Sequence, residues 1–489
     1  MTYTLQQFFP IFALDPSRKR RSRISFQIHC SSESSKEEKE GFEEQSNVVL
    51  VERYRNGTAK RYVIDGNSKV QTFLEEQKAV TNDSQFSSSF NTKVSWLPDG
   101  IKVFVLPSGF PGSVSDDYLE YMLLQLPTNI TGWICSILVT SSLLKAVGVG
   151  SFSGTSAAAT AAAIRWVSKD GLGTLGRFFI GGRFGDLFDN DPKQWRMYAD
   201  FIGSAGSIFD LTTPLFPAYF LPLASLGNLT KAVARGLRDP SFRVIQNHFA
   251  VSGNLGEVAA KEEVWEVTAQ LIGLGLGVLV LDSPGIQTSY TTLTLTWLSM
   301  RLLHLLLRYQ SLSVLVFNTI NLKRARMLVK SHVLHSVVPG YVDCNKKENF
   351  LSWQKFLKPS IIFGVSLEEI IDGERSVSKV KALLELYKAE QYILVVNQQL
   401  QTEFQVLISF KVNATGLSVL RSIWQTYWLY EHWQGRDSKN VFDQLQESMS
   451  KLDARFDDFL KQLEEAGWDV KQIKLKVPTE LLFEEMHTA

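Results

Sequence analysis

Basic side chains recur at helical spacing in the segment NLTKAVARGLRDPSFR. Asn228, Lys231, Arg235 and Arg238 are three or four residues apart, so a helix that ends at the Asp239-Pro240 step would place them on one face. Lys and Arg side chains on a shared face can bind phosphate, because their N–H groups make charge-assisted hydrogen bonds to its oxygens. The spacing predicts an anion pocket for a phosphorylated small molecule or a lipid headgroup, with Lys231, Arg235 and Arg238 as phosphate ligands.

A second polar group follows at the same spacing. Asn254, Glu257 and Lys261 would share a helix face, with Glu257 orienting one of the phosphate ligands. The alternative is that these charges form interhelical salt bridges or a solvated helix face, because an unpaired charge beside apolar segments is costly. The predicted ligand-binding residues are Asn228, Lys231, Arg235, Arg238, Arg243, Asn254, Glu257 and Lys261.

Other patterns that could carry chemistry have simpler structural explanations. Gly171, Gly173 and Gly176 form GxGxxG, but the preceding residues 156–170 have strong helix propensity, whereas a dinucleotide site requires a strand there. We therefore expect these glycines to end one helix and begin the next.

An acidic group, Asp186, Asp189, Asp191 and Asp200, offers oxygen ligands but lacks the spacing of a calcium loop. Asp189, Asn190 and Asp191 before Pro192 offer instead a helix N-cap followed by proline at the first helical position. His332 and His335 share a helix face without an acidic or Cys partner nearby in the sequence. We predict no metal site, and the sequence identifies neither a catalytic residue nor a cofactor.

These residues lie among long uncharged windows. Several windows approach the roughly 20 residues that a membrane-spanning helix needs. Small residues recur four apart in this region, as in closely packed membrane helices: Gly150 and Gly154, Ala157 and Ala161, Gly181 and Gly185, Gly273 and Gly277. The windows are Tyr121–Leu144, Ala146–Ile164, Leu211–Thr230, Val267–Leu281 and Ser283–Met300.

The windows favour a mainly α fold with a helical, membrane-embedded core over residues 96–340. Because they also contain Ser, Thr, Asn and Pro, and the mean hydropathy of the chain is only −0.03, a soluble all-α core with buried helices would produce the same pattern.

The N-terminal part has a different composition. Residues 1–45 are rich in Arg and Ser and poor in acidic residues before Glu33, which is typical of a transit peptide followed by a linker; we expect cleavage after Cys30. Residues 46–95 contain two β-rich runs around Arg55-Asn56-Gly57, which predicts a β-hairpin and a linker.

Residues 341–489 predict a small α+β module. The order of strands and helices, with a last strand at 470–477 and one extra helix, approximates a ferredoxin-like sandwich. Trp424, Trp428 and Trp433 lie at helical spacing and could form an exposed binding stripe, although a packed core face fits aromatic residues better.

A basic run precedes this module and includes Lys323, Arg324, Arg326 and Lys330. Positive residues of this kind often lie beside a membrane-proximal helix, and they would equally form one solvated helix face.

Composition limits the possible functions of the chain. Its 489 residues carry a formal net charge of +1 and no basic stripe, which argues against nucleic acid as a partner. The three cysteines are far apart without CxxC spacing, so neither a disulfide framework nor a zinc site is indicated, and a reducing compartment is expected.

Several short motifs within residues 97–334, about half the chain, resemble the root UVB sensitive family in the right order. They include LPSGFPGSVSDDYLEYMLLQLP, RFGDLFDNDPKQWRMYADF and NHFAVSGNLGEVAAKEEVWEV. The resemblance is to a plastid-type plant member, and it supplies no agreed catalytic residues. It implies a role in seedling development, the UV-B response and vitamin B6 or auxin homeostasis.

We therefore expect a non-enzymatic, membrane-associated scaffold or transport-like protein of the plastid. The alternatives are a small-molecule binding protein or enzyme that acts on a phosphorylated metabolite such as a B6 vitamer, and a soluble adaptor. The expected partners are a second copy or a paralogue in an oligomer, the plastid membrane and a phosphorylated small molecule.

Overall fold

The computed structural model describes residues 48–53, 58–64, 70–76, 98–147, 191–351, 358–371, 377–397, 404–433, 441–478 and 481–484, with single positions between 164 and 190. The chain forms two compact units, Met1–Lys78 and Ala79–Ala489. The predicted transit peptide, and the GxGxxG glycines other than Gly171, lie outside the described residues.

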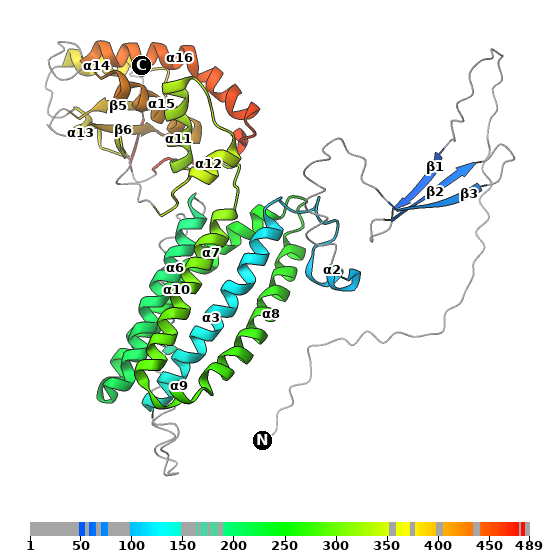
Figure 1. Cartoon of the computed structure of the whole chain (residues 1–489). Coiled ribbons are helices and arrows are strands. Elements are labelled where there is room, and N and C mark those ends of the chain that lie inside the picture. Colours follow the sequence, from blue (N-terminus) through cyan, green and yellow to red (C-terminus); the bar gives the residue numbers. More distant parts are fainter. Residues whose placement is uncertain are drawn as a thin grey trace, which may run out of the picture. The chain divides into compact units, whose positions relative to one another are not determined.

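The first unit contains an antiparallel sheet in the order β1-β2-β3 (Figure 1). β1 (Val48–Arg53) pairs with β2 (Thr58–Ile64), on either side of the turn predicted at Arg55-Asn56-Gly57, which itself lies outside the described residues. β3 (Val70–Glu76) extends the sheet and was not predicted.

The second unit begins with a bundle of long helices that lie side by side (Figure 1). The predicted helix at Pro192 is confirmed as α6. The elements of this bundle are α2 (Asp99–Val105), α3 (Tyr118–Val147), α6 (Pro192–Thr212), η1 (Thr213–Leu215), η2 (Pro217–Tyr219), α7 (Phe220–Phe249), α8 (Leu255–Leu281), α9 (Pro284–Thr288) and α10 (Tyr290–Val314).

The prediction that Asp239-Pro240 ends a helix is wrong, because α7 contains Pro240 and continues to Phe249. Proline removes one backbone donor, while Leu237 before it and Ile245 after it are both buried. Packing on both sides of the proline therefore holds the helix together.

Glycines allow the bundle helices to touch. A Cβ on Gly273 of α8 would lie 2.6 Å from Trp133 Cβ of α3, and one on Gly277 would collide with Ile137. This agrees with the close approach predicted for this pair of glycines. The other small-residue pairs predicted from the sequence lie outside the described residues.

Two of the apolar windows lie in helices long and apolar enough to cross a membrane, Tyr118–Ala146 and Leu255–Leu281. Only 17% of the most apolar stretch of the second helix is buried in the structure. The window Leu211–Thr230 is not a single helix, because two 3₁₀ turns with prolines at their starts precede α7.

The remaining part forms an α+β region around a four-stranded sheet (Figure 1). Its elements are α11 (Leu322–His335), α12 (Tyr341–Lys347), β4 (Ser360–Phe363), α13 (Leu367–Ile371), α14 (Val377–Leu386), β5 (Tyr392–Val396), β6 (Gln405–Lys411), α15 (Gly416–His432), α16 (Val441–Glu465), η4 (Val470–Gln472) and β7 (Leu482–Phe483).

The sheet matches the ferredoxin-like prediction only in part. β6 pairs in parallel with β4 and antiparallel with β5, as in that fold, but the last strand, β7, pairs in parallel with β6. The strand predicted at 470–477 is wrong: Val470–Gln472 is a 3₁₀ turn, and Ile473 makes only an isolated bridge to Ile320. Residues 470–477 alternate between apolar and polar or charged side chains, which suits an extended segment that covers the core without joining the sheet.

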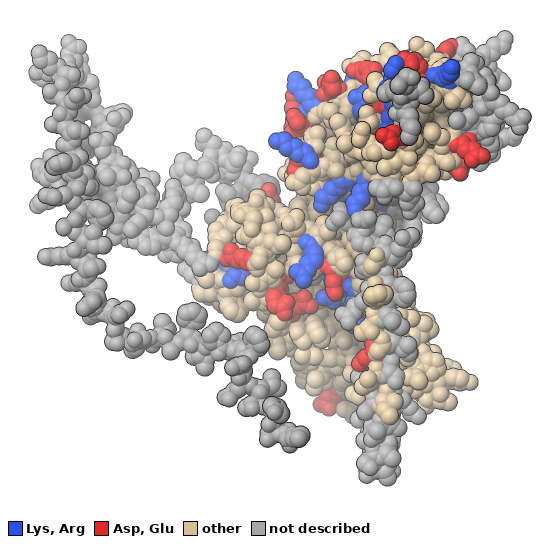
Figure 2. Space-filling model, turned by 180° about the vertical axis from the view of Figure 1, so that it is seen from behind, with Lys and Arg blue, Asp and Glu red and all other residues tan. Residues whose placement is uncertain are grey.

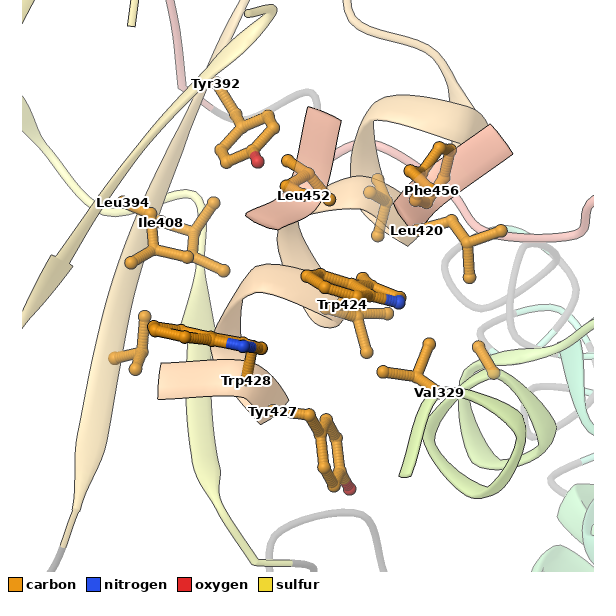
Figure 3. Packing of buried hydrophobic residues seen from close by; sticks show 14 of the residues in the cluster. Val329, Tyr392, Leu394, Ile408, Leu420, Trp424, Tyr427, Trp428, Leu452 and Phe456 are labelled. Atoms are coloured by element: carbon orange, nitrogen blue, oxygen red, sulfur yellow. The ribbon is translucent and has the colours of Figure 1, made fainter. Parts of the chain in front are cut away.

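Tryptophans of α15 form the centre of this region's core (Figure 3). Trp424 is fully buried, and its indole nitrogen donates to His332 Nδ1 at 3.1 Å. Trp428 is also buried and points toward the sheet residues Leu394 and Ile408. The packed core face predicted for the tryptophan stripe is therefore confirmed at these two positions.

Candidate functional site

A cavity of about 430 Å³ lies within the helical bundle. Three of the predicted phosphate ligands, Lys231, Arg235 and Arg238, line one side of it from α7. In addition, α6 contributes Asp200, and α10 contributes basic residues that were not predicted from the sequence. The polar lining residues from α3, α6, α8 and α10 include Asn129, Ser136, Thr140, Asp200, Ser207, Glu266, Arg301, His304 and Arg308.

Asp200 is the acidic centre of this cavity. Its Oδ2 accepts from Arg308 Nε at 2.7 Å and lies 3.6 Å from His304 Nε2, while its Oδ1 is 3.7 Å from Arg196 Nη1. Arg196, Arg308 and His304 are all buried. One carboxylate thus faces two guanidinium groups and an imidazole, so the group retains positive charge.

Arg308 is held by the bundle itself. Its other nitrogens contact Gln125 Oε1 and Asn129 Oδ1 of α3, in addition to Asp200. His304 is likewise anchored, because Nδ1 lies 2.8 Å from the backbone oxygen of Thr128. These two residues position the α10 side of the cavity.

Arg301 has a different set of partners. Its Nε donates to Ser204 Oγ at 2.5 Å and its Nη2 to the backbone oxygen of Asp200 at 2.7 Å. Both acceptors are uncharged groups, so the guanidinium is oriented toward the cavity without a hydrogen-bonded carboxylate. An oriented guanidinium of this kind can recognise the oxygens of an anion.

The α7 residues are partly compensated. Lys231 forms an ion pair with Asp210, a fully buried residue of α6, where Gly206 and Gly227 bring the two helices close together. Arg238 lies 3.4 Å from Glu266 of α8, and its side chain is 43% exposed. Arg235 is exposed and lies at the rim of the cavity.

Among the described residues that line the cavity, basic side chains outnumber acidic ones. Lys231, Arg235, Arg238, Arg301 and Arg308 are basic, and Asp200 and Glu266 are acidic. Lys231 also pairs with Asp210, which is not one of the lining residues. The described lining is therefore rich in basic groups, which also make structural contacts.

The other predicted site residues lie elsewhere. Asn228 donates to Asp170 at 3.2 Å, Arg243 is exposed on α7, and neither lines the cavity. Lys261 donates to the backbone oxygens of Val103 and Phe104 at 2.6 and 3.1 Å.

Lys261 and Glu257 of the second predicted polar group therefore anchor the end of α2 and the segment that follows it. Glu257 accepts from the backbone N and Oγ of Ser108 at 2.7 and 2.5 Å, which differs from the predicted role of orienting a phosphate ligand. Asn254 is the residue before α8, and its side chain makes no capping hydrogen bond there. Helical spacing identified the shared face of α8 correctly but not the segment that the face contacts.

A signal for the missed residues was present in the sequence. Arg301, His304 and Arg308 are three and four residues apart, directly after the uncharged window that ends at Met300. Charged residues inside an otherwise apolar helix are expected to face the interior of a bundle. Applying that rule to α10 would have added them to the candidate site.

A second charged cluster lies between α6, α11 and α12. Lys323 pairs with Asp191 at 2.6 Å, and Glu348 Oε2 accepts from Arg324 Nε and Nη2 at 3.1 and 2.9 Å. Lys193 Nζ lies 3.7 Å from the same Glu348 oxygen. These side chains are nearly fully buried, so the solvated face considered for the basic run is wrong for Lys323 and Arg324.

The electrostatics of Glu348 favour its charged form. Burial raises the pKa of Glu348, but the nearby cations Arg324 and Lys193 lower it by a larger amount. The net pKa therefore lies below the usual value for glutamate. Asp191 occupies the predicted N-cap position of α6 but makes no capping hydrogen bond, because its carboxylate pairs with Lys323. Among the residues that the structure describes, no three His, Cys, Asp or Glu side chains group as metal ligands.

Comparisons with known proteins cover both regions of the second unit. Residues 91–336 match the family model described as the vitamin B6 photo-protection and homoeostasis domain, and residues 338–479 match that of the root UVB sensitive protein C-terminal region. No solved structure matches the chain.

Curated relatives extend the match to almost the whole chain. Protein root UVB sensitive 5 of Arabidopsis thaliana is 63% identical over 96% of this chain and 94% of its own length. Protein root UVB sensitive 2, chloroplastic, of the same plant is 26% identical over 81% of this chain and 90% of its own length. RUS family member 1 of Dictyostelium discoideum is 32% identical over 56% of this chain and 52% of its own length. With both of its characteristic domains present in order, the chain belongs to the root UVB sensitive family.

Proposed function

We propose that this protein is a membrane-embedded, transport-like protein of the plastid that binds a phosphate-bearing anion in the cavity between α3, α6, α7 and α10. The proposal treats the protein as non-enzymatic. The observation that carries it is a combination of two features of the bundle: buried charged side chains surround the cavity, and α8 and α10 expose large apolar side chains.

The outer faces of α8 and α10 support the membrane part of the proposal. Leu271 and Leu279 of α8 are 66% and 70% exposed, and Leu302 and Leu306 of α10 are 60% and 58% exposed. Figure 2 shows that much of the described surface in the lower, helical part is uncharged, while charges are dense over the upper part. An apolar surface of this extent is unusual on a soluble monomer and suits contact with lipid.

The interior supports the anion part. Charged side chains inside a membrane bundle are costly and mark the binding site or path of a polar ligand. Arg301 and Arg308 line the cavity from α10 and Lys231 and Arg238 line it from α7, so an anion in the cavity would meet donors from two helices. Charge-assisted hydrogen bonds to each donor would replace part of the hydration that the anion loses.

The family model supports the choice of ligand. Its description refers to vitamin B6 homoeostasis. The phosphorylated B6 vitamers are small anions, and their size suits a cavity of about 430 Å³. The plastid assignment is supported by the relative named as chloroplastic and by the composition of residues 1–45.

Two measurements test the proposal. The first is a carbonate wash of plastids that carry the tagged protein, followed by detergent. Retention in the membrane through the wash and release by detergent is expected, and release by carbonate would contradict membrane embedding.

The second measurement is equilibrium binding of a phosphorylated B6 vitamer to the purified full chain. Arg301→Gln should weaken binding roughly 10- to 150-fold, because a hydrogen bond to a charged group contributes about 1.5–3 kcal/mol. Arg243→Gln is the matched control, because Arg243 is exposed on α7 and does not line the cavity. Equal affinities for the two variants would contradict the assignment of the cavity.

A further inference from the structure

We infer that the cavity also binds an anionic amphiphile, with its phosphate among the basic residues and its hydrocarbon chain in an adjoining groove between α3 and α8. This inference rests on the proposed anion-binding function and adds a second class of phosphate-bearing ligand for the same site.

The groove is a second depression, with a volume of about 540 Å³. It lies along the line where Gly273 and Gly277 of α8 contact α3. Its lining contains aliphatic and aromatic side chains with three hydroxyl groups and one lysine: Trp133, Ser136, Ile137, Thr140, Ser141, Leu144, Lys145, Leu274 and Leu281.

The groove and the cavity share lining residues on α3. Trp133, Ser136 and Thr140 line both of them. These residues are three and four apart and therefore form one stripe of the helix, with the basic cavity on one side and α8 on the other. A ligand at the stripe could contact both depressions at once.

The two depressions differ in chemistry. The basic residues that line the cavity lie on α7 and α10. In the groove, α8 contributes only Leu274 and Leu281. From Trp133 to Lys145 the groove follows α3 for about 18 Å, at 1.5 Å per residue. The length and apolar lining match a hydrocarbon chain, and the adjoining positive charge matches an anionic head.

Energetics favour an occupant with both parts. A free phosphate would fill the charged end only and leave the groove's apolar surface uncovered. A chain that covered this surface would remove apolar area from water, which is favourable in proportion to the area covered. Leu274 is 36% exposed and Leu144 38% exposed, so part of that area is open in the structure.

The test compares three probes on the full chain purified in a zwitterionic nanodisc: glycerol phosphate, a long-chain monoalkyl phosphate and the matching uncharged alcohol. We expect the alkyl phosphate to bind at least about 10-fold more tightly than glycerol phosphate, and the alcohol to bind more weakly than the alkyl phosphate. Ser141→Trp should fill the groove, remove the advantage of the alkyl chain and leave the affinity for glycerol phosphate unchanged.

Ser299→Trp is the matched control, because Ser299 is exposed on α10 and lines neither depression. If Ser141→Trp does not fold, photocrosslinking of the wild-type protein by an alkyl phosphate with a reactive chain end should label α3 and α8 near Leu144 and Leu281. Labelling confined to other helices would overturn the inference.

The possible failures are distinguishable. Equal affinity for the long-chain phosphate and glycerol phosphate would overturn the amphiphile and retain the anion cavity. Equal affinity for the alkyl phosphate and the alcohol would show partition into the bilayer and also overturn it. Loss of binding for every phosphate probe, including the B6 vitamer, would contradict the proposed function itself.

Discussion

Replacing Glu348 by Gln should strongly destabilise the contact between the two family regions. Glu348 belongs to the C-terminal region, and its partners Arg324 and Lys193 belong to the first region. Gln preserves the size of the side chain and one hydrogen-bond acceptor but removes the charge. Two buried cations would then lose their shared carboxylate.

The expected cost follows from the burial of the pair. The side chains of Glu348, Arg324 and Lys193 are 1%, 3% and 1% exposed. Removing one partner of a buried ion pair typically costs about 3–5 kcal/mol, because the remaining charge is left uncompensated. An exposed pair contributes roughly 0–1 kcal/mol, and Glu385→Gln, in a pair with Lys388 at 3.1 Å, is therefore the control.

Pulse proteolysis in urea is a suitable assay, because it reports the fraction of molecules in which residues 341–479 are accessible to cleavage. With a slope of about 1.5–3 kcal/mol per molar urea, Glu348→Gln should lower the midpoint by roughly 1–3 M. The reasoning would be refuted if the urea midpoints of Glu348→Gln and Glu385→Gln differed by less than about 0.3 M.

The same carboxylate predicts a pH dependence. Because the folded pKa of Glu348 is lowered, its contribution to stability is fully present above the unfolded value of about 4.3 and is lost as the pH falls through the folded value. The stability difference between the wild type and Glu348→Gln should therefore shrink below about pH 4. A difference that stayed constant through this range would contradict the assignment of the charge.

Three further substitutions test other parts of the structure. Gly277→Val should force α8 away from α3 and cost at least about 1–3 kcal/mol, whereas Gly275→Ala, with no atom within 4 Å of the added Cβ, should be neutral or stabilising; thermal unfolding in detergent distinguishes them. Trp424→Ala should cost about 3–5 kcal/mol in urea unfolding, because it empties a fully buried site, and a loss below about 1 kcal/mol would contradict the described packing. Lys231→Met should destabilise the bundle by removing the cation that pairs with the buried Asp210, and the double variant with Asp210→Leu should recover most of the loss in the same thermal assay.

Local periodicity predicted much of the helical architecture. The 3.6-residue pattern identified the faces of α7 and α8, Pro192 marked the start of α6, and the aromatic spacing in α15 predicted a packed face. The spacing of Gly273 and Gly277 also indicated where α8 touches a neighbour. These features depend on residues within one or two turns, so the sequence contains the information directly.

Partners across helices could not be predicted in the same way. Lys231 and Arg238 were selected with Glu257, but the structure places Asp210 and Glu266 beside them and Ser108 beside Glu257. Periodicity shows which side chains share a face, while the order in which the bundle helices pack decides what each face contacts. Pro240 was misjudged because tertiary packing outweighed a local preference.

The contact between Ile320 and the segment at Ile473 has a consequence for the order in which the protein folds. Ile320, just before α11, bridges to Ile473, and Lys474 N donates to the Ile320 oxygen at 2.9 Å. A contact across about 150 residues cannot form until the chain as far as residue 474 is free to fold. The bundle helices end at Val314 and can associate before that point. The segment around Ile473 therefore joins the fold late, and truncation after α16 should leave an assembled bundle and an uncovered C-terminal core.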